Sequence, residues 1–247
     1  MSSTTGAAAG VSAPQRQGGR VGIMQPYLFP YLGYFQLLAA VDDYVVYDDA
    51  QFIKGGWINR NHILLDGASH RFSIALSQAS PNRRIDEIAV ADDFSRFLRT
   101  LEHAYSRAPM RDAALALVRR ICSFEDRNLA RFIVHSLVCI AEYLGLGTRL
   151  WLSSDIPKDG AASAQDKVLR MCEHLHAGTY INAIGGQGLY AREAFEARGI
   201  ALHFLKSGEC RYRQFGTAFV GGLSIIDVLM FNQPEAVRGL LQDYTLL

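Results

Sequence analysis

Residues 20–49 constrain the fold most, because two strand-like segments here enclose one helix-like segment. A short buried strand is predicted at 20–25, a helix at 31–41 entered through Pro30, and a β-branched, aromatic strand at 42–49. A strand, a helix and a strand in such close succession are typical of a parallel, doubly wound sheet. Ligands bind such sheets beyond the carboxyl ends of the strands, so the junction after the first strand is a candidate site.

The alternation of strands and helices is interrupted at about 50–148. Strands within 58–65 and 70–76 are predicted to form a hairpin, because Asp66-Gly67 between them is a typical two-residue turn. Segments with helical spacing of apolar residues follow the hairpin. We interpret the whole stretch as an insertion of a β-hairpin and helices.

The alternation then resumes. Strands are expected at 149–156, 179–184 and 200–206, and helices at 163–178, 191–199, 223–233 and 234–244. The helix at 163–178 is expected to begin after Ser163 and to end at Gly178. The predicted fold is therefore α/β: a Rossmann-like, mostly parallel sheet of about five strands with a β-hairpin and helical insertion.

Composition narrows the class of protein further. The chain has 247 residues, of which 49% are hydrophobic, and a net charge of +1. It can bury a sizeable core and lacks the basic excess of a nucleic-acid-binding or membrane-surface protein. We expect one domain at 20–247 after a disordered tail at 1–19, and a cytoplasmic location. The four cysteines form no CxxC pair and the histidines are scattered, so we expect no disulfide, metal site or cofactor.

The turn after the first strand, in "GIMQPYLFPYLGYFQLL" (22–38), carries polar and aromatic side chains where a ligand is expected. Gln25, Tyr27 and Tyr34 offer amide and phenol groups that would bind a polar ligand. The alternative is that the aromatic side chains only pack against the edge of the sheet. Their place at the strand end favours the binding interpretation.

The segment 47–61, "YDDAQFIKGGWINRN", holds the densest group of polar side chains. Adjacent residues of a strand point to opposite faces, so only one of Asp48 and Asp49 is expected to face the crevice, as a general base or an anchor for an amine. The remaining members are donors for phosphate, carboxylate or an oxyanion: Gln51, Lys54, Asn59, Arg60 and Asn61. The alternative is a solvated loop.

Three further positions are candidates. Cys172 is either a packed thiol or a nucleophile that accepts an acyl group, and the sequence shows no histidine partner for it. The loop "NAIGGQGLY" (182–190) brings Gly185, Gly186 and Tyr190 to the end of a strand, where its backbone could approach a ligand. Ser224 and Asp227 have capping-box spacing, and the Ser224 hydroxyl could also bind an anion.

Four stretches together resemble the WbqC-like family: "IMQPYLFPYLGYFQLL", "VVYDDAQFIKGGWINRNHIL", "YINAIGGQGLY" and "LSIIDVLMFN". The resemblance runs from about residue 21 to 233. Members of this bacterial family are often encoded among polysaccharide genes, and some are described as glycine (aminoacyl) transferases acting on amino sugars. The resemblance implies an acyl or aminoacyl transferase that forms an amide on a small amine in polysaccharide or secondary-metabolite biosynthesis.

Residue roles follow from that implication. Asp48 would be the base or amine anchor, Arg60 and Lys54 would hold an anionic group, Asn59 and Asn61 would position substrate or contact an oxyanion, and Cys172 would be the nucleophile. The expected partners are small-molecule substrates, with a carrier-protein- or thioester-bound acyl donor as one option, and neither nucleic acid nor a membrane.

Two other functions stay open from the sequence. The first strand, turn and helix are also similar to the start of HIGH-type nucleotidylyltransferases, which suggests a nucleotide-dependent ligase or nucleotidylyltransferase. The comparable stretch here, "YLGYF", keeps Gly33 but lacks both histidines that hold ATP phosphates in those enzymes. The other alternative is a non-catalytic binding module of a biosynthetic complex.

Overall fold

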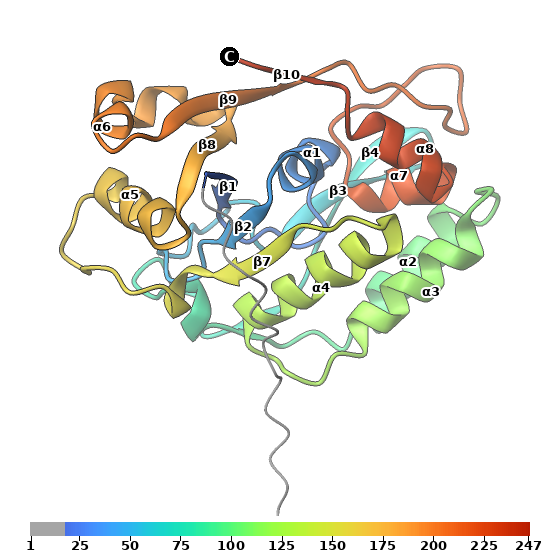
Figure 1. Ribbon diagram of the computed structural model, residues 1–247. Helices are drawn as coiled ribbons and strands as arrows, with labels where there is room; N and C mark the ends of the chain where they lie inside the picture. Colours follow the sequence, from blue (N-terminus) through green and yellow to red (C-terminus); the bar gives the residue numbers. More distant parts are fainter. Residues whose placement is uncertain (1–17) are drawn as a thin grey trace, which may run out of the picture.

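The computed structural model describes residues 18–247 and is built around a six-stranded sheet (Figure 1). The strand order is β10-β9-β8-β1-β2-β7, and every neighbouring pair is parallel except β10 with β9. The strands are β1 (Gly19–Met24), β2 (Asp43–Val46), β7 (Arg149–Leu152), β8 (Ala177–Ala183), β9 (Ala201–Ser207) and β10 (Tyr244–Leu246). The predicted Rossmann-like α/β fold is confirmed.

Helices cover both faces of the sheet, as Figure 1 shows. On one face, α5 (Ala164–His174) and α6 (Arg192–Glu196) share a core with apolar side chains of β1, β2, β8 and β9. On the other face, α1 (Leu32–Ala40) lies in a larger core together with α4 (Leu129–Leu144), α7 (Ile225–Phe231) and α8 (Pro234–Leu240). Strands buried on both faces account for the continuous apolar runs of β1 and β2.

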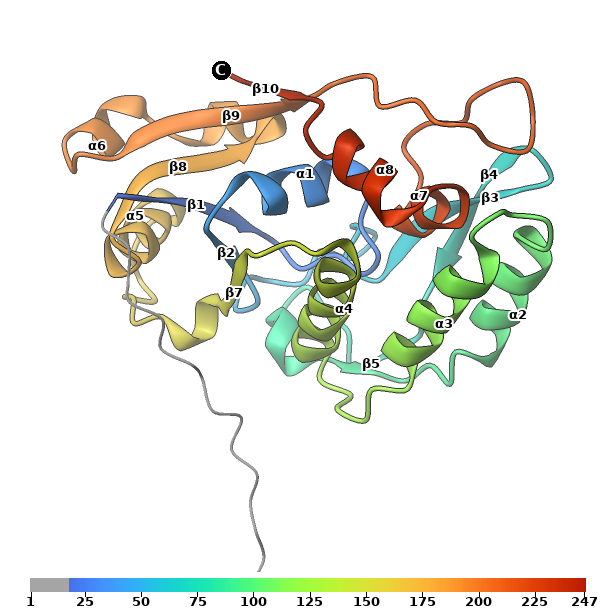
Figure 2. The ribbon, with the colours of Figure 1, turned by 45° about the vertical axis from the view of Figure 1, so that its right-hand side comes forward.

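The insertion between β2 and β7 lies to one side of the sheet (Figure 2). It contains the hairpin β3 (Arg60–Leu65) and β4 (Ala68–Ser73), the short pair β5 (Leu76–Ser77) and β6 (Ala89–Val90), and the helices α2 (Ser95–Ala104), α3 (Arg111–Cys122) and α4. Asp66 and Gly67 both have positive φ, 51° and 75°, as a type I′ hairpin turn requires. The predicted hairpin and helical insertion are therefore present.

Several predicted boundaries are wrong. The helix expected to end at Gly178 ends at His174, and Gly178 already belongs to β8. The strand expected at 149–156 ends at Leu152, because Ser153–Asp155 turn into a 3₁₀ helix, η2. β10 was not predicted: it pairs with β9 and begins at Tyr244, the last residue of the helix expected at 234–244.

The predicted tail at 1–19 lies outside the described residues, apart from Gly18 and Gly19. Gly19 already belongs to β1 and is paired with Ala177 of β8, so the first strand begins one residue before the expected position 20. Within residues 18–247, no helix has both the length and the apolar character needed to cross a membrane.

Candidate functional site

A cavity of about 640 Å³ lies beyond the carboxyl ends of β1 and β8. β1 leads through α1 to β2 on one side, whereas β8 leads through α6 to β9 on the other, so the direction of winding reverses between these two neighbours. Ligands bind doubly wound sheets at this reversal point. The side chains on its wall that can form hydrogen bonds or stack are Gln25, Tyr27, Tyr31, Tyr47, Trp57, Asn182, Tyr190 and Ser207. We call this cavity the crevice.

The rim of the crevice is unusually apolar for an exposed surface. Tyr31, Trp57, Ile184 and Leu189 all line it, and each is more than a third exposed, Leu189 as much as 70%. Exposed apolar groups gathered around a concavity mark binding sites. Among the described residues that line the crevice, none carries a charge at neutral pH.

The opening turn is held rigidly, and the predicted residues divide between its surface and its interior. Gln25 and Tyr27 line the crevice. Tyr34 lies behind them, fully buried, and its hydroxyl donates to the carbonyl of Gln25 at 3.0 Å. Burial raises the pKa of Tyr34 well above its usual value, so this phenol stays a neutral donor.

Glycine at position 33 allows α1 to approach the end of β9. A Cβ at Gly33 would come within 2.7 Å of both the Oγ of Ser207 and a ring carbon of Tyr31. Only a residue without a side chain fits there, because real Cβ atoms do not make contacts that short. This close approach brings Tyr31 and Ser207 together on the crevice wall.

Asn61 and Ser224 support the opening turn and do not line the crevice. Both donate to the carbonyl of Phe29, Asn61 through Nδ2 at 2.8 Å and Ser224 through Oγ at 2.7 Å. Phe29 has a φ of 47°, a left-handed conformation that costs free energy for such a residue. The two hydrogen bonds offset part of that cost, so these residues position the turn.

Removing one of these bonds has a measurable consequence. We expect Ser224→Ala to lower the free energy of unfolding by about 1–3 kcal/mol, because it leaves the buried Phe29 carbonyl with one donor and removes the cap of α7. Each kcal/mol moves the midpoint of a protein this size by roughly 2–4 °C in a thermal melt. The exposed Ser106→Ala is the control. Equal melting of both variants would show that the bond to Phe29 does not stabilise the turn.

Asp48 and Asp49 turn toward β7 instead of the crevice. Asp48 is 1% exposed and accepts bonds from Ser153 Oγ at 2.9 Å, from Ser154 N at 2.9 Å and from Ser154 Oγ at 2.6 Å. Asp49 accepts from Ser153 and forms an ion pair with Lys158 at 2.7 Å. Neither aspartate lines the crevice, so the expectation that one of them faces it is wrong: β2 ends at Val46, and both side chains turn to η2.

The other polar residues of 47–61 are spread over the insertion. Asn59 donates to the carbonyl of Ile74 at 2.7 Å and so holds the base of the hairpin. Gln51 and Lys54 are exposed and lie outside the crevice lining. These three side chains therefore do not meet at one place.

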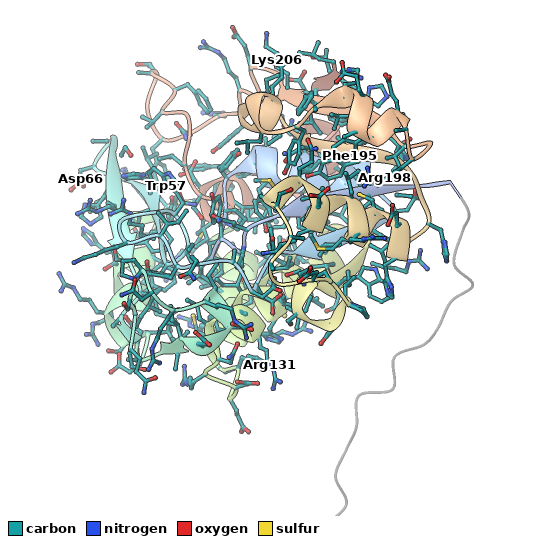
Figure 3. All side chains as sticks on the ribbon, turned by 90° about the vertical axis from the view of Figure 1, so that its left-hand side faces the viewer. Trp57, Asp66, Arg131, Phe195, Arg198 and Lys206 are labelled. Atoms are coloured by element: carbon teal, nitrogen blue, oxygen red, sulfur yellow. The ribbon has the colours of Figure 1, made fainter. Side chains whose placement is uncertain are left out.

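Arg60 reaches the crevice indirectly, through Trp57. Its guanidinium carbon lies 5.6 Å from the centre of the Trp57 ring, a cation–π distance, and the ring of His62 packs on the same tryptophan at 5.4 Å. Trp57 lines the crevice and is 46% exposed. Figure 3 shows it on the same side of the molecule as Asp66 at the hairpin tip. The insertion thus contributes an aromatic wall, backed by a cation.

The glycine-rich loop reaches the crevice, as the sequence predicts. Gly185 and Gly186 belong to a 3₁₀ turn, η3 (Ile184–Leu189), directly after β8, and Tyr190 follows it. A Cβ at Gly186 would collide with Nδ2 of Asn182, so this glycine permits the loop to fold against that amide. The hydroxyls of Tyr190 and the buried Tyr180 lie 3.3 Å apart, which fixes the Tyr190 ring.

The sequence analysis did not single out five side chains of the crevice wall, and two of them, Asn182 and Tyr47, show how they could have been found; the five are Tyr31, Tyr47, Trp57, Asn182 and Ser207. Asn182, 5% exposed, uses Oδ1 to accept from the backbone of Ala183 at 2.8 Å, and among the described residues its Nδ2 donates no hydrogen bond. Tyr47 follows β2, and burial, with smaller effects of Asp49 and Tyr190, raises its pKa to about 12. Asn182 and Tyr47 could both have been found by searching for polar residues at the ends of core strands, the same rule that identified Gln25.

Cys172 lies in the core between α5 and the sheet. It is fully buried beside apolar side chains of β1 and β8, and burial raises the pKa of its thiol well above the usual value. A reactive cysteine needs a lowered pKa and access to substrate. The structure gives Cys172 neither, in keeping with the packed-thiol alternative.

The comparison with known proteins agrees with the motifs. A model of the WbqC-like protein family matches residues 25–239, which include the insertion and the whole crevice lining except Ile23 and Met24. The chain belongs to the WbqC-like protein family. The uncharacterized protein Rv1507c of Mycobacterium tuberculosis (strain ATCC 25618 / H37Rv) is 28% identical over 222 residues, which span 88% of this chain and 95% of that relative.

In this WbqC-like protein the segment after β9 is tied down by a buried carboxylate. Asp227 is fully buried and accepts from Tyr105 Oη at 2.7 Å, Tyr212 Oη at 2.6 Å and Gln214 Nε2 at 2.8 Å. Ser224 does cap α7, but Asp227 does not complete the expected capping box, because its side chain joins this network instead. Asp227 therefore fastens the 208–223 segment to the insertion.

Proposed function

We propose that this protein is an acyl or aminoacyl transferase that forms an amide on a small amine, such as an amino sugar, in polysaccharide or secondary-metabolite assembly. The observation that carries the proposal is the neutral lining of the crevice, which combines aromatic rings with amides and hydroxyls. Aromatic faces and neutral hydrogen-bonding groups suit a hydroxyl-rich ring better than they suit a phosphate chain. The same reaction class is what the resemblance to the WbqC-like family implies, since some of its members are described as glycine (aminoacyl) transferases.

The proposed reaction uses an activated acyl donor, such as a thioester. The amine of the acceptor attacks the acyl carbon, its oxygen becomes an oxyanion, and the thiolate leaves as the carbonyl re-forms; the proton lost by nitrogen goes to the thiolate. Asn182 Nδ2 is the proposed donor to the oxyanion, and Gln25 and Tyr27 orient the acceptor. Positioning of two reactants supplies the remaining acceleration. Asp48 and Cys172 take no part in this scheme.

Thermal unfolding with added ligands tests the substrate class. The panel contains an amino sugar without a nucleotide, the same sugar linked to a nucleotide, an aminoacyl thioester and ATP. A ligand at about a hundred times its Kd adds about 2.7 kcal/mol, a shift of several degrees. Stabilisation by the amino sugar or the thioester, followed by amide formation when both are present, is the expected result. Stabilisation by ATP alone would contradict the proposal and favour nucleotidyl transfer.

The neutral lining also favours a second function, a binding module that presents a ligand without turning it over. A crevice wall without a charged side chain among its described residues has no ordinary acid or base for proton transfer. Binding of the amino sugar without amide formation from any thioester donor would select this function.

The aromatic wall gives a prediction common to both functions. We expect Trp57→Ala to weaken ligand binding by about 1–2 kcal/mol, which is roughly 5- to 30-fold in Kd, because the ligand loses a stacking face. Trp57→Phe should retain most of the affinity. Ile53→Ala is the control, since Ile53 is 50% exposed and lies outside the crevice lining. Calorimetric titration measures the three Kd values, and an unchanged Kd in Trp57→Ala would remove the rim from the site.

A further inference from the structure

A second cavity, of about 200 Å³, adjoins the crevice on the side of α1. The two cavities share Tyr31, Gly33 and Ser207 in their linings, so they are separated only by the Tyr31 ring, the bare backbone of Gly33 and one hydroxyl. We call this second cavity the inner chamber. Its other walls come from α1, α7 and the 208–223 segment, which Figure 2 shows leaving β9 and returning to α7.

The inner chamber contains a buried acceptor that has no partner. Gln36 lines it, is fully buried, and its Oε1 receives no hydrogen bond within the described part of the chain. The orientation of this amide is fixed, because Nε2 donates to the carbonyls of Leu240 at 3.0 Å and Asp243 at 2.8 Å. Reversing the amide would set Oε1 against two carbonyl oxygens. Leaving a buried acceptor unpaired is unfavourable, so Oε1 is available to a donor that enters the chamber.

Most of the remaining chamber wall is apolar, and its other polar members are Ser207, Cys210 and the largely exposed Glu209. Leu223 and Val228 are buried in its wall, and Phe219 and the ring of Tyr212 complete it. The bond from Tyr212 to Asp227 holds this wall in place before any ligand arrives. A small volume, a mostly apolar wall and a buried acceptor together suit a short acyl chain that carries a hydrogen-bond donor.

We propose that the inner chamber receives the acyl group of the donor and selects a short acyl group bearing an ammonium or hydroxyl, such as an α-aminoacyl group, through Gln36 Oε1. This assignment rests on the proposed transferase function and adds which part of the donor lies where. The acceptor occupies the crevice, and the acyl carbon lies at the partition near Tyr31. Binding the acyl group there involves no covalent step with the protein.

Two thioesters of N-acetylcysteamine test the selection, because glycyl and propionyl groups differ only by an ammonium in place of a methyl. Cys210 lies in the chamber wall and is the partly exposed thiol, whereas Cys122, Cys139 and Cys172 are buried. Protection of Cys210 from iodoacetamide, read by peptide mass spectrometry with S-acylated Cys210 counted separately, therefore reports occupancy. We expect the glycyl thioester to protect at a concentration at least tenfold below that of the propionyl thioester. Equal protection, or none by either, would overturn the proposal.

Two variants, one control variant and a second readout distinguish a specific loss of ligand binding from a folding defect. Gly221→Phe places a ring at the chamber rim, where a Cβ has only ordinary contact with Phe219 at 3.5 Å, and should abolish the protection. Gly147→Phe, where a Cβ meets nothing within 4 Å, is the matched control outside the chamber. Gln36→Met should remove the preference for glycyl over propionyl. Melting-temperature shifts with the same two thioesters give the same comparison independently of thiol reactivity.

The outcome also distinguishes failure of the chamber assignment from failure of the proposed transferase function. An amino sugar that stabilises the protein and is acylated, without any glycyl preference in the Cys210 assay, would refute the chamber and leave the transferase intact. Glycyl-selective protection of Cys210 without turnover of any amine would support the chamber and refute the transferase.

Discussion

Asn182→Ala is expected to lower kcat for amide formation by about 10²- to 10³-fold while KM changes little, as for other single donors to an oxyanion. The reason is that Nδ2 has no other partner among the described residues and lies on the crevice wall at the end of β8. A donor whose bond forms only as the acyl oxygen gains charge affects the transition state and not the bound substrate. Steady-state kinetics over both substrates measure the effect.

The matched control for this change is Asn82→Ala, an asparagine exposed in the insertion. Both variants should melt close to the wild-type temperature, which would show that a lower kcat does not come from unfolding. A rise in KM without a fall in kcat would place Asn182 in ground-state binding only. Unchanged kinetics would remove Asn182 from the reaction and strengthen the binding-module alternative.

The sequence predicted most of the fold because its signals are local. Asp66-Gly67 indicates the hairpin turn, and Asn128 and Gly145 are residue types typical of the two ends of α4, where Asn128 accepts from Arg131 N and Gly145 has a φ of 66°. β10 could not be predicted, since three half-exposed residues become a strand only because β9 offers them an unpaired edge. The end of α5 was misplaced because glycine was interpreted as a cap.

The switch-point rule predicted part of the crevice, whereas counting polar residues pointed to side chains that lie elsewhere. The switch-point rule brought Gln25, Tyr27, Gly185, Gly186 and Tyr190 to the same cavity, although they lie far apart in the sequence. Counting polar residues failed for 47–61, because such side chains also satisfy buried backbone groups, as the bond from Asn61 to Phe29 shows. Sequence alone does not say whether an amide faces a ligand or a carbonyl.

Asp227→Ala is expected to lower the free energy of unfolding by about 3–5 kcal/mol at pH 7, because it leaves three buried donors without an acceptor. The Tyr105 hydroxyl accepts from the backbone N–H of Leu64 at 3.0 Å and donates its own proton to Asp227. At roughly 2–4 °C per kcal/mol the melting temperature should fall by well over 5 °C. Tyr212→Phe removes one donor and should cost only about 1 kcal/mol.

Asp112→Ala is the control for the loss of a carboxylate, since the side chain of Asp112 is 91% exposed and should contribute little. Urea denaturation at fixed pH compares the three variants with the wild type. An effect of Asp227→Ala no larger than that of Asp112→Ala would mean that the 208–223 segment is not fastened through this network. The inner chamber would then lack a preformed wall.

The same carboxylate gives the direction of a pH effect. Burial raises the pKa of Asp227 above its ordinary 3.8, and its hydrogen bonds offset the rise only in part. The folded protein therefore holds this proton more tightly than the unfolded chain, so the contribution of Asp227 to stability is full below the unfolded pKa and declines as the pH rises through the folded pKa. Asp227→Asn cannot titrate, so the wild-type advantage over it should shrink from acid toward neutral pH in urea denaturation. An advantage that grows with pH would mean that the three donors outweigh the cost of burying the charge.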